Sequence, residues 1–409
     1  MSDPSTSFPK HRIKVLLLEN IHASAADLLA AEGFQVATHR SALDGPELVD
    51  ALRDVHVLGI RSRTDVRLPA LIEAKRLLAI GCFCIGTNQV DLDAARLRGI
   101  PVFNAPFANT RSVAELALAE IIALSRQLGD RSRDLHAGRW RKATDGASEV
   151  RGKTLGIVGY GHIGSQLGVL AEAIGLRVIF HDIARRMALG NAREVGFDPL
   201  LAEADFVSLH VPQTERTRHL VGAAELGRMK PGAFLLNLSR GTVVDLDATA
   251  DALRRGHLGG CAIDVYPSEP ERDSDAFVTP LQGLPNVLLT PHVGGSTHEA
   301  QAAIGRQVAS TLARFVNAGT TAEAVNFPRL DVEPEPGRHR ILNVHRNVPG
   351  VLRDINRIVG DVSANVHRQA LATDADIGYL IMDLDQDLSN DVRAAIGSLP
   401  TSVRTRILY

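Results

Sequence analysis

The stretch TLGIVGYGHIGSQLGVLAEAIGLRVIFHD, from Thr154 to Asp182, constrains the fold of this chain more than any other. It begins with a short apolar run, Thr154 to Val158, which is typical of a buried parallel strand. The pattern of Gln166 to Ile174 predicts a helix, and the apolar run Arg177 to Phe180 predicts a second strand. Strand, helix and strand in this order indicate a βαβ unit, and therefore a parallel sheet.

Three glycines between the first strand and the helix form the pattern GxGxxG: Gly159, Gly161 and Gly164. Such glycines permit a tight turn, let the backbone approach a pyrophosphate and bring the helix close to the strand. The free N–H groups and the positive dipole end of the helix would face the phosphates. Asp182 follows the second strand. A carboxylate at this position accepts hydrogen bonds from the ribose hydroxyls of the adenosine and repels a 2′-phosphate. The pattern alone is a weak signal, but in this order it indicates a site for NAD rather than NADP, and not an ordinary βαβ turn.

The composition is that of a globular protein and argues against several other classes. Hydrophobic residues make up 45% of the chain and charged residues 22%, and the formal net charge of −2 gives no reason to expect nucleic-acid binding. No apolar run approaches membrane-spanning length, and the polar start lacks the apolar core of a signal peptide. Cys82, Cys84 and Cys261 have no zinc-type spacing. We therefore expect no metal site, no disulfide framework and a reducing cytoplasm.

The rest of the chain also alternates between strand-like and helix-like patterns. Before the βαβ unit, the strand-like runs are 13–18, 34–37, 55–60 and 77–80, and the helix-like runs are 24–31, 47–52, 92–98 and 112–128. A polar segment, 131–149, separates the last of these helices from the unit. After the unit, strand-like runs at 206–210, 233–238, 260–264 and 287–289 precede a helical stretch at 299–317. This alternation predicts parallel sheets on both sides of the long helix.

The C-terminal part follows a different pattern. The segment from Pro328 to Gly337 is rich in proline and acidic residues and is typical of a linker. Beyond it, the runs 340–345, 351–359, 365–372, 378–384, 391–396 and 403–408 fit the order βαββαβ. That order predicts a small α+β domain of the ferredoxin-like type.

The predicted fold class is therefore α/β, with two Rossmann-like doubly wound parallel-sheet domains and a C-terminal α+β domain. The helical stretch at 299–317 can return the chain to the first domain, so we expect that domain to be discontinuous, with residues 1–107 and 300–330. The dinucleotide-binding domain is then 108–299, and the C-terminal domain is 338–409.

Three candidates for catalysis follow strand-like runs: Arg240, Glu269 and His292. In open α/β sheets, ligands bind outside the carboxyl ends of the strands. Histidine is the usual base near neutral pH, and a nearby carboxylate raises its pKa and fixes its orientation. Arginine suits a planar carboxylate through two parallel hydrogen bonds. Each residue alone could be a surface charge, a loop residue or a backbone partner, but the three together, after a dinucleotide-binding unit, indicate dehydrogenation of an alcohol, with Arg240 needed if the substrate is a hydroxy acid.

These residues lie in blocks that resemble a known family. LGIVGYGHIG, LLNLSRGTVVD, AIDVYPSEP and LLTPHVGGST are similar to the signature blocks of the D-2-hydroxyacid dehydrogenases, whose catalytic Arg, Glu and His fall on Arg240, Glu269 and His292. IRSRTDV, IGCFCIGTNQVDLDAARLRGIPVFNAPFANTRSVAEL and the C-terminal domain resemble the bacterial members that act on 3-phospho-D-glycerate. The resemblance covers essentially the whole chain. It implies oxidation of that substrate to 3-phosphooxypyruvate, the first step of L-serine biosynthesis.

The resemblance also implies contacts to NAD beyond the three glycines. The residues that match the family's cofactor contacts are His162, Ile163, Asp182, Leu238, Ser239, Arg240, Asp264, His292, Val293, Gly294 and Gly295.

A second group of residues bears on the choice of substrate. A 3-phosphate needs positive charge and donors, which Arg61, Ser62 and Arg63 supply after the strand-like run 55–60. The alternative is that Arg61, Ser62 and Arg63 form a solvated loop that binds no ligand. By family match Asn109 contacts substrate, and Lys142, near Trp140, contacts phosphate from a neighbouring subunit.

The C-terminal domain resembles the ACT domain, a small amino-acid-sensing module. HRNVPGVL places His345, Asn347 and Gly350 in the turn between the first strand and the first helix. The family match implies that His345, Asn347 and Asn365 bind L-serine as an effector between two paired domains of a homotetramer. The alternative is that the domain only holds the oligomer together.

Two rival functions stay open from the sequence. One is a related dehydrogenase that acts on glycerate, on another 2-hydroxy acid or on 2-oxoglutarate, against which Arg61, Arg63 and the sensor domain argue. The other is a non-catalytic NAD-sensing co-regulator, against which the intact set of Arg240, Glu269 and His292 argues.

Overall fold

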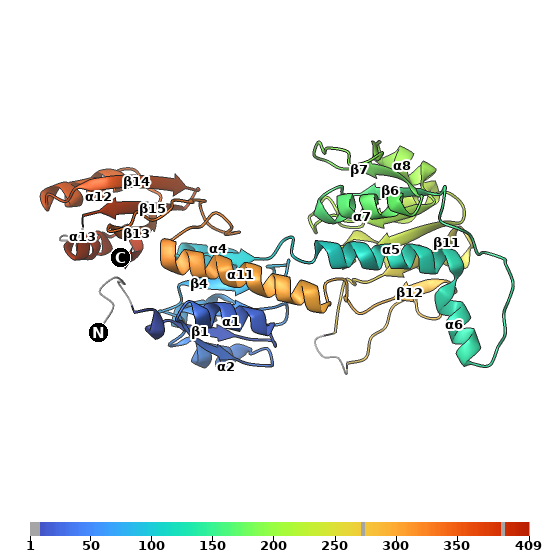
Figure 1. The fold of residues 1–409 in the computed structure, drawn as a ribbon, viewed down its shortest axis with the longest axis horizontal. Coiled ribbons are helices and arrows are strands. Elements are labelled where there is room, and N and C mark those ends of the chain that lie inside the picture. Colours follow the sequence, from blue (N-terminus) through green and yellow to red (C-terminus); the bar gives the residue numbers. More distant parts are fainter. Residues whose placement is uncertain (1–8, 271–274, 386–388, 409) are drawn as a thin grey trace. The chain divides into compact units, whose positions relative to one another are not determined.

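The structure, a computed structural model, describes residues 9–270, 275–385 and 389–408. The chain divides into two compact units, the first made of Met1–Ala108 with Gln301–Tyr409 and the second of Asn109–Ala300 (Figure 1). Each unit contains a parallel sheet with helices on both faces, and the first also contains a four-stranded antiparallel sheet. The predicted fold class is confirmed.

The parallel sheet of the first unit has the strand order β2-β1-β3-β4-β5. Its strands are β1 (Lys14–Leu17), β2 (Gln35–Thr38), β3 (Val57–Ile60), β4 (Ala79–Cys82) and β5 (Val102–Asn104), and a short 3-10 helix, η1 (Lys10–Arg12), precedes them. One face packs on α1 (Ala23–Ala31) and α11 (His298–Ala318). The other face packs on α2 (Gly45–Leu52), α3 (Leu68–Glu73) and α4 (Leu92–Leu97). Because both faces are covered, β3 and β4 are buried along their whole length, as expected of parallel strands.

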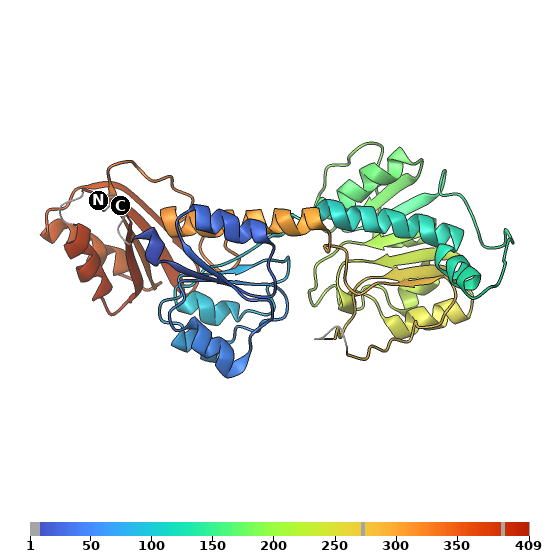
Figure 2. The same ribbon diagram turned by 60° about the horizontal axis from the view of Figure 1, so that its bottom comes forward.

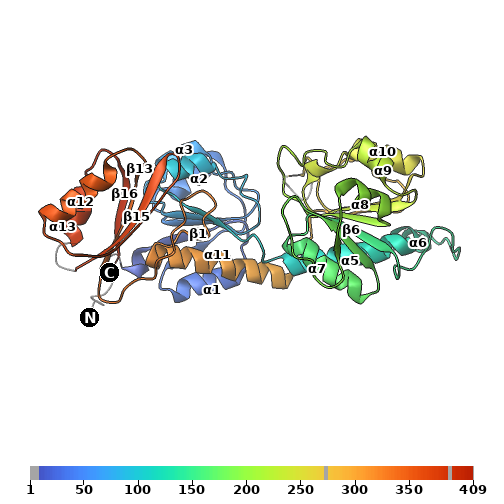
Figure 3. The same ribbon diagram turned by 90° about the horizontal axis from the view of Figure 1, so that it is seen from above.

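Helix α11 joins distant parts of the sequence in this unit. It lies beside α1 (Figures 1 and 3), where the Ser24 hydroxyl donates to the Ala302 carbonyl over 3.1 Å. Gly305 permits this approach, since a Cβ atom there would lie 2.6 Å from the Ser24 hydroxyl. Helices α1 and α11 are therefore closely packed, although almost 280 residues separate Ser24 from Ala302 in the sequence.

The antiparallel sheet has the order β14-β15-β13-β16. Its elements are β13 (His339–Arg346), α12 (Val351–Asp361), β14 (Val366–Thr373), β15 (Ile377–Leu384), α13 (Ser389–Gly397) and β16 (Ser402–Leu408). The two helices cover one face (Figure 3). Leu342, Val344 and Tyr379 on the other face share one hydrophobic core with α1 and α11.

Polar contacts also tie the antiparallel sheet to the rest of its unit. The Tyr379 hydroxyl donates to the Gly319 carbonyl over 2.6 Å. The buried Arg340 guanidinium pairs with Asp383 at 2.6 Å and donates to the carbonyls of Ala318, Val332 and Glu333. The segment expected as a linker is therefore held against the sheet.

The second unit has a seven-stranded sheet in the order β12-β11-β10-β9-β6-β7-β8. Its strands are β6 (Thr154–Val158), β7 (Arg177–His181), β8 (Arg193–Glu194), β9 (Phe206–Leu209), β10 (Ala233–Asn237), β11 (Leu258–Ile263) and β12 (Val287–Leu289). Helices α5 (Thr110–Arg126) and α7 (His162–Ala173) pack on one face. Helices α8 (Phe197–Glu203), α9 (Ala223–Arg228) and α10 (Leu246–Arg254) pack on the other (Figure 2).

The long helix expected at 112–128 ends two residues early. Gln127 has a φ of 51°, in the left-handed region, and it separates α5 from a further helix, α6 (Leu128–His136). Helix α6 lies partly in the polar segment to which the sequence assigned no structure. None of the helices in the described part of the chain is long and apolar enough to cross a membrane.

Candidate active site

Three neighbouring strands of the second unit carry the three catalytic candidates just after their carboxyl ends. Arg240 follows β10, Glu269 follows β11 and His292 follows β12. These strands are adjacent in the sheet and parallel, so the segments that leave them emerge along one edge.

Glu269 and His292 form a hydrogen-bonded pair. The Nδ1 atom of His292 lies 2.9 Å from Oε2 and 3.1 Å from Oε1 of Glu269, and Oε1 also accepts the Tyr266 N–H over 3.1 Å. The hydrogen bond to Glu269 raises the pKa of His292 above its ordinary value, although burial opposes it. Burial alone would raise the pKa of Glu269, but the bond to His292 leaves it below its ordinary value. The pair can therefore hold a proton on the imidazole beside an ionised carboxylate.

Asp264 fixes the turn that carries His292. Its buried carboxylate accepts hydrogen bonds from the Thr290 hydroxyl at 2.7 Å, the Val293 N–H at 2.8 Å and the Gly294 N–H at 2.9 Å. His292 itself has a φ of 54°, a left-handed conformation that is uncommon outside glycine. Bonds on both sides of His292 hold it in this conformation.

Arg240 lies in a segment that packs closely against the one bearing Glu269. The Asn237 side chain donates to the Arg240 carbonyl over 3.0 Å and accepts from the Ser239 hydroxyl over 2.8 Å. A 3-10 turn, η2 (Gly241–Val243), follows, and a Cβ atom on Gly241 would lie only 1.9 Å from the Tyr266 carbonyl carbon. The positive charge of Arg240 lowers the pKa of both Glu269 and His292, so Arg240 interacts electrostatically with both side chains.

The glycine turn after β6 has the shape of a dinucleotide cradle. Gly159 has a φ of 91°, and a Cβ atom there would lie 2.4 Å from the His210 carbonyl oxygen. A Cβ atom on Gly164 would lie 2.2 Å from the Gly159 oxygen, whereas one on Gly161 would meet no heavy atom within 4 Å. Two glycines thus close the turn, and the third leaves space in front of the first turn of α7, where His162 and Ile163 lie. The residues present fit a pyrophosphate there.

Asp182 follows β7 and supports this turn from the side. Its carboxylate accepts the Tyr160 N–H over 3.0 Å and the Ala184 N–H over 2.8 Å. Arg186 pairs with the same carboxylate at 3.1 Å. The sequence analysis did not single out Arg186, although its place four residues after Asp182 is visible in the sequence.

Asn109 lies next to the His292 turn. It precedes α5, and a Cβ atom on Gly295 would meet its side-chain nitrogen at 2.8 Å. The side-chain oxygen of Asn109 is buried and has no hydrogen-bond partner among the described residues. Leu238 and Ser239, which precede Arg240, are buried.

The loop with Arg61, Ser62 and Arg63 belongs to the first unit and is held by a residue that the sequence analysis missed. The Glu19 carboxylate accepts the backbone N–H groups of Arg61 at 3.0 Å, Arg63 at 2.9 Å and Thr64 at 2.9 Å. Glu19 is buried, with 7% of its surface exposed, while Ser62 and Arg63 are exposed. The loop therefore turns around one carboxylate rather than continuing as an extended strand.

Comparison with known proteins gives one consistent family. Residues 118–294 match the sequence model of the D-isomer specific 2-hydroxyacid dehydrogenase, NAD binding domain. The D-3-phosphoglycerate dehydrogenase of Dictyostelium discoideum is 54% identical and covers 100% of both chains, and that of Escherichia coli K12 is 48% identical and covers 98% of this chain and 99% of its own. The chain belongs to the D-isomer-specific 2-hydroxyacid dehydrogenase family. It is an NAD-dependent oxidoreductase.

A solved structure of the family shares the fold. D-lactate dehydrogenase from Aquifex aeolicus, complexed with NAD and lactic acid, matches with a TM-score of 0.67 at 26% identity, over 77% of this chain and 99% of its own.

Two other sequence-predicted residues of this dehydrogenase lie in an exposed segment. Lys142 and Trp140 follow α6 in a stretch without regular structure, and Trp140 is 81% exposed. The described residues of the second unit do not cover this tryptophan.

The structure corrects the expected position of His345. Strand β13 continues to Arg346, so His345 lies inside the strand and not in the turn. It is buried, its Nδ1 atom lies 2.9 Å from the Asn343 side-chain oxygen, and burial lowers its pKa. Gly378 on β15 makes room for its ring, since a Cβ atom there would lie 2.2 Å from Nε2.

Asn347 and Asn365 lie at opposite ends of the antiparallel sheet. Asn347 is bound to the turn between β14 and β15, through its side chain to the Asp374 carbonyl at 2.6 Å and its N–H to the Asp376 carbonyl at 2.8 Å. Asn365 directly precedes β14, whose first residue pairs with Leu384 at the other end of β15. Eight strand residues separate the two ends, about 27 Å. One chain therefore does not bring the two asparagines together.

Proposed function

We propose that this enzyme oxidises 3-phospho-D-glycerate to 3-phosphooxypyruvate with NAD, the first step of L-serine biosynthesis. The observation that carries the proposal is the hydrogen-bonded pair of Glu269 and His292, with Arg240 acting on both, in the unit that holds the glycine turn. The names of the relatives from Dictyostelium discoideum and Escherichia coli support the choice of substrate.

In this proposal each catalytic side chain has one task. Arg240 binds the substrate carboxylate and the oxygen on C2 through its planar guanidinium. His292 removes the proton from the C2 hydroxyl, and Glu269 stabilises the imidazolium that forms. A bound nicotinamide would supply the acceptor for the hydride that leaves C2. In the reverse direction His292 returns its proton to the C2 oxygen.

The cofactor contacts proposed here are the residues expected from the sequence. The glycine turn and the first turn of α7 face the pyrophosphate, and Asp182 binds the adenosine ribose. The Asp264 carboxylate is engaged by the turn that it holds, so we assign it the positioning of His292 as well.

We assign the 3-phosphate to the loop of Arg61, Ser62 and Arg63. The Glu19 carboxylate accepts the N–H groups of Arg61 and Arg63 and so holds the backbone of this loop in a turn. The unpartnered side-chain oxygen of Asn109 is a further acceptor for substrate. Lys142 would contact the phosphate of a substrate molecule bound by a neighbouring subunit.

We also propose that L-serine is an effector, bound by His345, Asn347 and Asn365. Since one chain holds Asn347 and Asn365 at opposite sheet ends, two antiparallel copies of β14 would complete the site. The turn bound by Asn347 is tied to α4, because Arg96 pairs with Asp374 at 3.2 Å and Asp376 at 2.7 Å. This chain of contacts connects the effector turn to the first parallel sheet.

Self-association as a homotetramer belongs to the same proposal. Trp140 is 81% exposed and Leu135 on α6 is 57% exposed, and such apolar side chains are suited to an interface. The buried thiols Cys82 and Cys261 accord with a reducing cytoplasm.

The experiment is NADH oxidation with three substrates: 3-phosphooxypyruvate, unphosphorylated hydroxypyruvate and 2-oxoglutarate. We expect the phosphorylated substrate to have the highest kcat/KM, and millimolar L-serine to lower its turnover. Equal kcat/KM for hydroxypyruvate would contradict the phosphate assignment. Absence of turnover with all three would contradict the enzymatic function, and unchanged turnover in serine would leave the C-terminal sheet a structural role only.

A further inference from the structure

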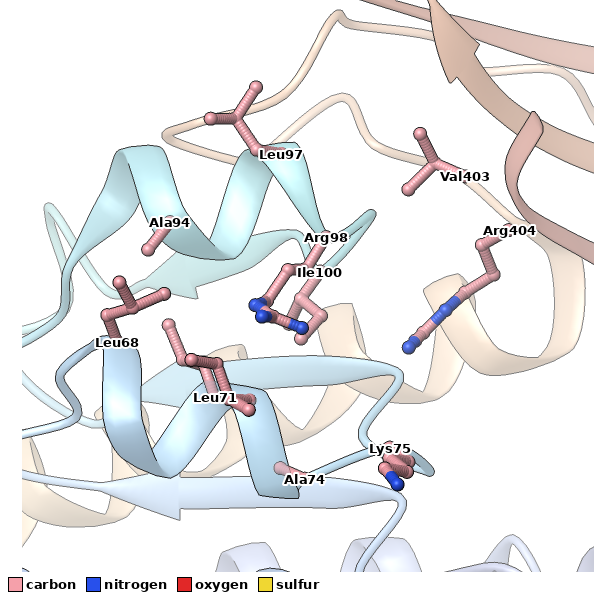
Figure 4. A pocket seen from close by; sticks show the side chains of 11 residues that line it. Leu68, Leu71, Ala74, Lys75, Ala94, Leu97, Arg98, Ile100, Val403 and Arg404 are labelled. Atoms are coloured by element: carbon pink, nitrogen blue, oxygen red, sulfur yellow. The ribbon is translucent and has the colours of Figure 1, made fainter. Parts of the chain in front are cut away.

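A cavity of about 550 Å³ opens within the first unit, and its lining includes none of the residues assigned to catalysis, cofactor or serine. Helices α3 and α4 form one side and strand β16 forms the other (Figure 4). Its volume lies in the range of small-molecule sites. The cavity thus lies between the helices α3 and α4, which cover the parallel sheet, and β16 of the antiparallel sheet.

One part of the cavity is apolar. Leu71 forms its buried wall, and Leu68, Ile72 and Leu97 contribute large side chains that are 45%, 42% and 52% exposed. Neighbouring aliphatic side chains that stay exposed around a cavity favour an apolar ligand group.

The other part carries three positive charges: Lys75, Arg98 and Arg404. Figure 4 shows Arg98 and Lys75 on the helix side of the cavity and Arg404 on the strand side. Within residues 9–270, 275–385 and 389–408, none of the three forms an ion pair, and Arg404 donates to the Leu77 carbonyl. The lining contains no acidic side chain.

The charges of Arg98 and Arg404 repel each other. Burial, with the charges of Arg406 and Arg98, lowers the pKa of Arg404 to about 10. An anion in the cavity would offset this repulsion and accept hydrogen bonds from two guanidinium groups.

We propose that this cavity binds a small organic anion, with its carboxylate or phosphate held by Lys75, Arg98 and Arg404 and its apolar body against Leu71 and Leu97. The ligand contacts both the α3–α4 side and β16, so its binding stabilises the packing of the antiparallel sheet on the parallel sheet. The site is separate from the proposed serine site and does not depend on the proposed activity.

The test uses the full-length protein and octanoate as the probe, with calorimetry and thermal unfolding as readouts. We expect one octanoate per chain and a raised Tm. Acetate, which lacks the apolar body, should bind at least about tenfold more weakly. Octanol and octylamine, which lack the anion, should not raise Tm. Octyl phosphate distinguishes the two head groups, and tighter binding than octanoate would assign the site to phosphate esters.

Variants locate the binding in the cavity. The double substitution Lys75→Gln and Arg98→Gln should raise the Kd of octanoate at least about tenfold and abolish the rise in Tm. Arg53→Gln is the matched control, because Arg53 is an exposed cation outside the cavity, and it should bind like the parent. None of the three substituted residues belongs to the proposed active site, so dehydrogenase activity reports an intact fold. Equal Kd in the double variant, or binding of octylamine as tight as octanoate, would overturn the proposal.

Discussion

The Nδ1 atom of His292 lies 2.9 Å from Oε2 of Glu269, and both side chains follow adjacent strands of the seven-stranded sheet. Each partner shifts the pKa of the other, upward for His292 and downward for Glu269. In the reductive direction the imidazole must be charged to give a proton to the C2 oxygen. The raised pKa therefore extends reductive activity toward higher pH.

Replacement of Glu269 by Gln should move this pH limit downward. Without the carboxylate the pKa of His292 falls, so kcat/KM for 3-phosphooxypyruvate should decline at a pH lower by about one unit or more. The measurement is the pH profile of kcat/KM for parent and variant. An unchanged alkaline limb would show that the pair does not control the proton.

Substitution of Glu19 should raise the KM for the phosphorylated substrate, although the Glu19 side chain does not contact the substrate. In Glu19→Gln an amide would face the N–H groups of Arg61, Arg63 and Thr64, and the loop would lose its turn. Because an unmatched buried donor costs about 1–3 kcal/mol, we expect KM to rise about tenfold.

The control is hydroxypyruvate, which lacks the phosphate and should show an unchanged KM with the Glu19→Gln variant. Equal increases for both substrates would indicate general loss of structure instead of loss of the phosphate contact.

Arg186 should decide how strictly the enzyme prefers NAD. Its ion pair with Asp182 is 3.1 Å long, so the substitution Asp182→Ser would release a guanidinium near the ribose position. An arginine there accommodates a 2′-phosphate. We expect the ratio of kcat/KM for NADP to that for NAD to rise about tenfold or more, and a second substitution, Arg186→Ala, to remove the gain. A gain that survives Arg186→Ala would refute this role.

Glu120 should make stability depend on pH. Both of its carboxylate oxygens are buried without a partner among the described residues, and burial with the Asp264 charge raises its pKa to about 8. The folded state therefore binds a proton that the unfolded state releases above its ordinary pKa of 4.5. This contribution to stability is complete at low pH and is lost as pH rises toward 8.

The variant Glu120→Gln keeps the shape without the ionisation. At pH 8.5 we expect its Tm to exceed that of the parent by roughly 2 °C or more, and the difference to shrink at pH 5. A Tm difference that does not change with pH would contradict a buried neutral carboxyl group.

The catalytic candidates could be predicted from the sequence because each is marked by a local pattern. Arg240, Glu269 and His292 each follow an apolar run, and the carboxyl ends of parallel strands meet at one edge of the sheet. The glycine turn was accessible too, since Gly159, Gly161 and Gly164 lie between a strand and a helix in a fixed order.

Contacts between segments that are distant in the sequence could not be predicted in this way. Glu19 follows β1 but holds a loop more than forty residues later, and no local pattern connects the two. Likewise, the packing of Tyr379 and Arg340 against the end of α11 depends on tertiary contacts, as does the burial of His345 beside Gly378.

Turnover of the His292→Asn variant tests the central claim most directly, with NADH binding measured by fluorescence on the same preparation. We predict that kcat falls by about 10²- to 10⁴-fold while the Kd of NADH stays within about twofold of the parent value. A variant that binds NADH and reduces 3-phosphooxypyruvate at a rate near the parent's would contradict the assignment of His292 as the base.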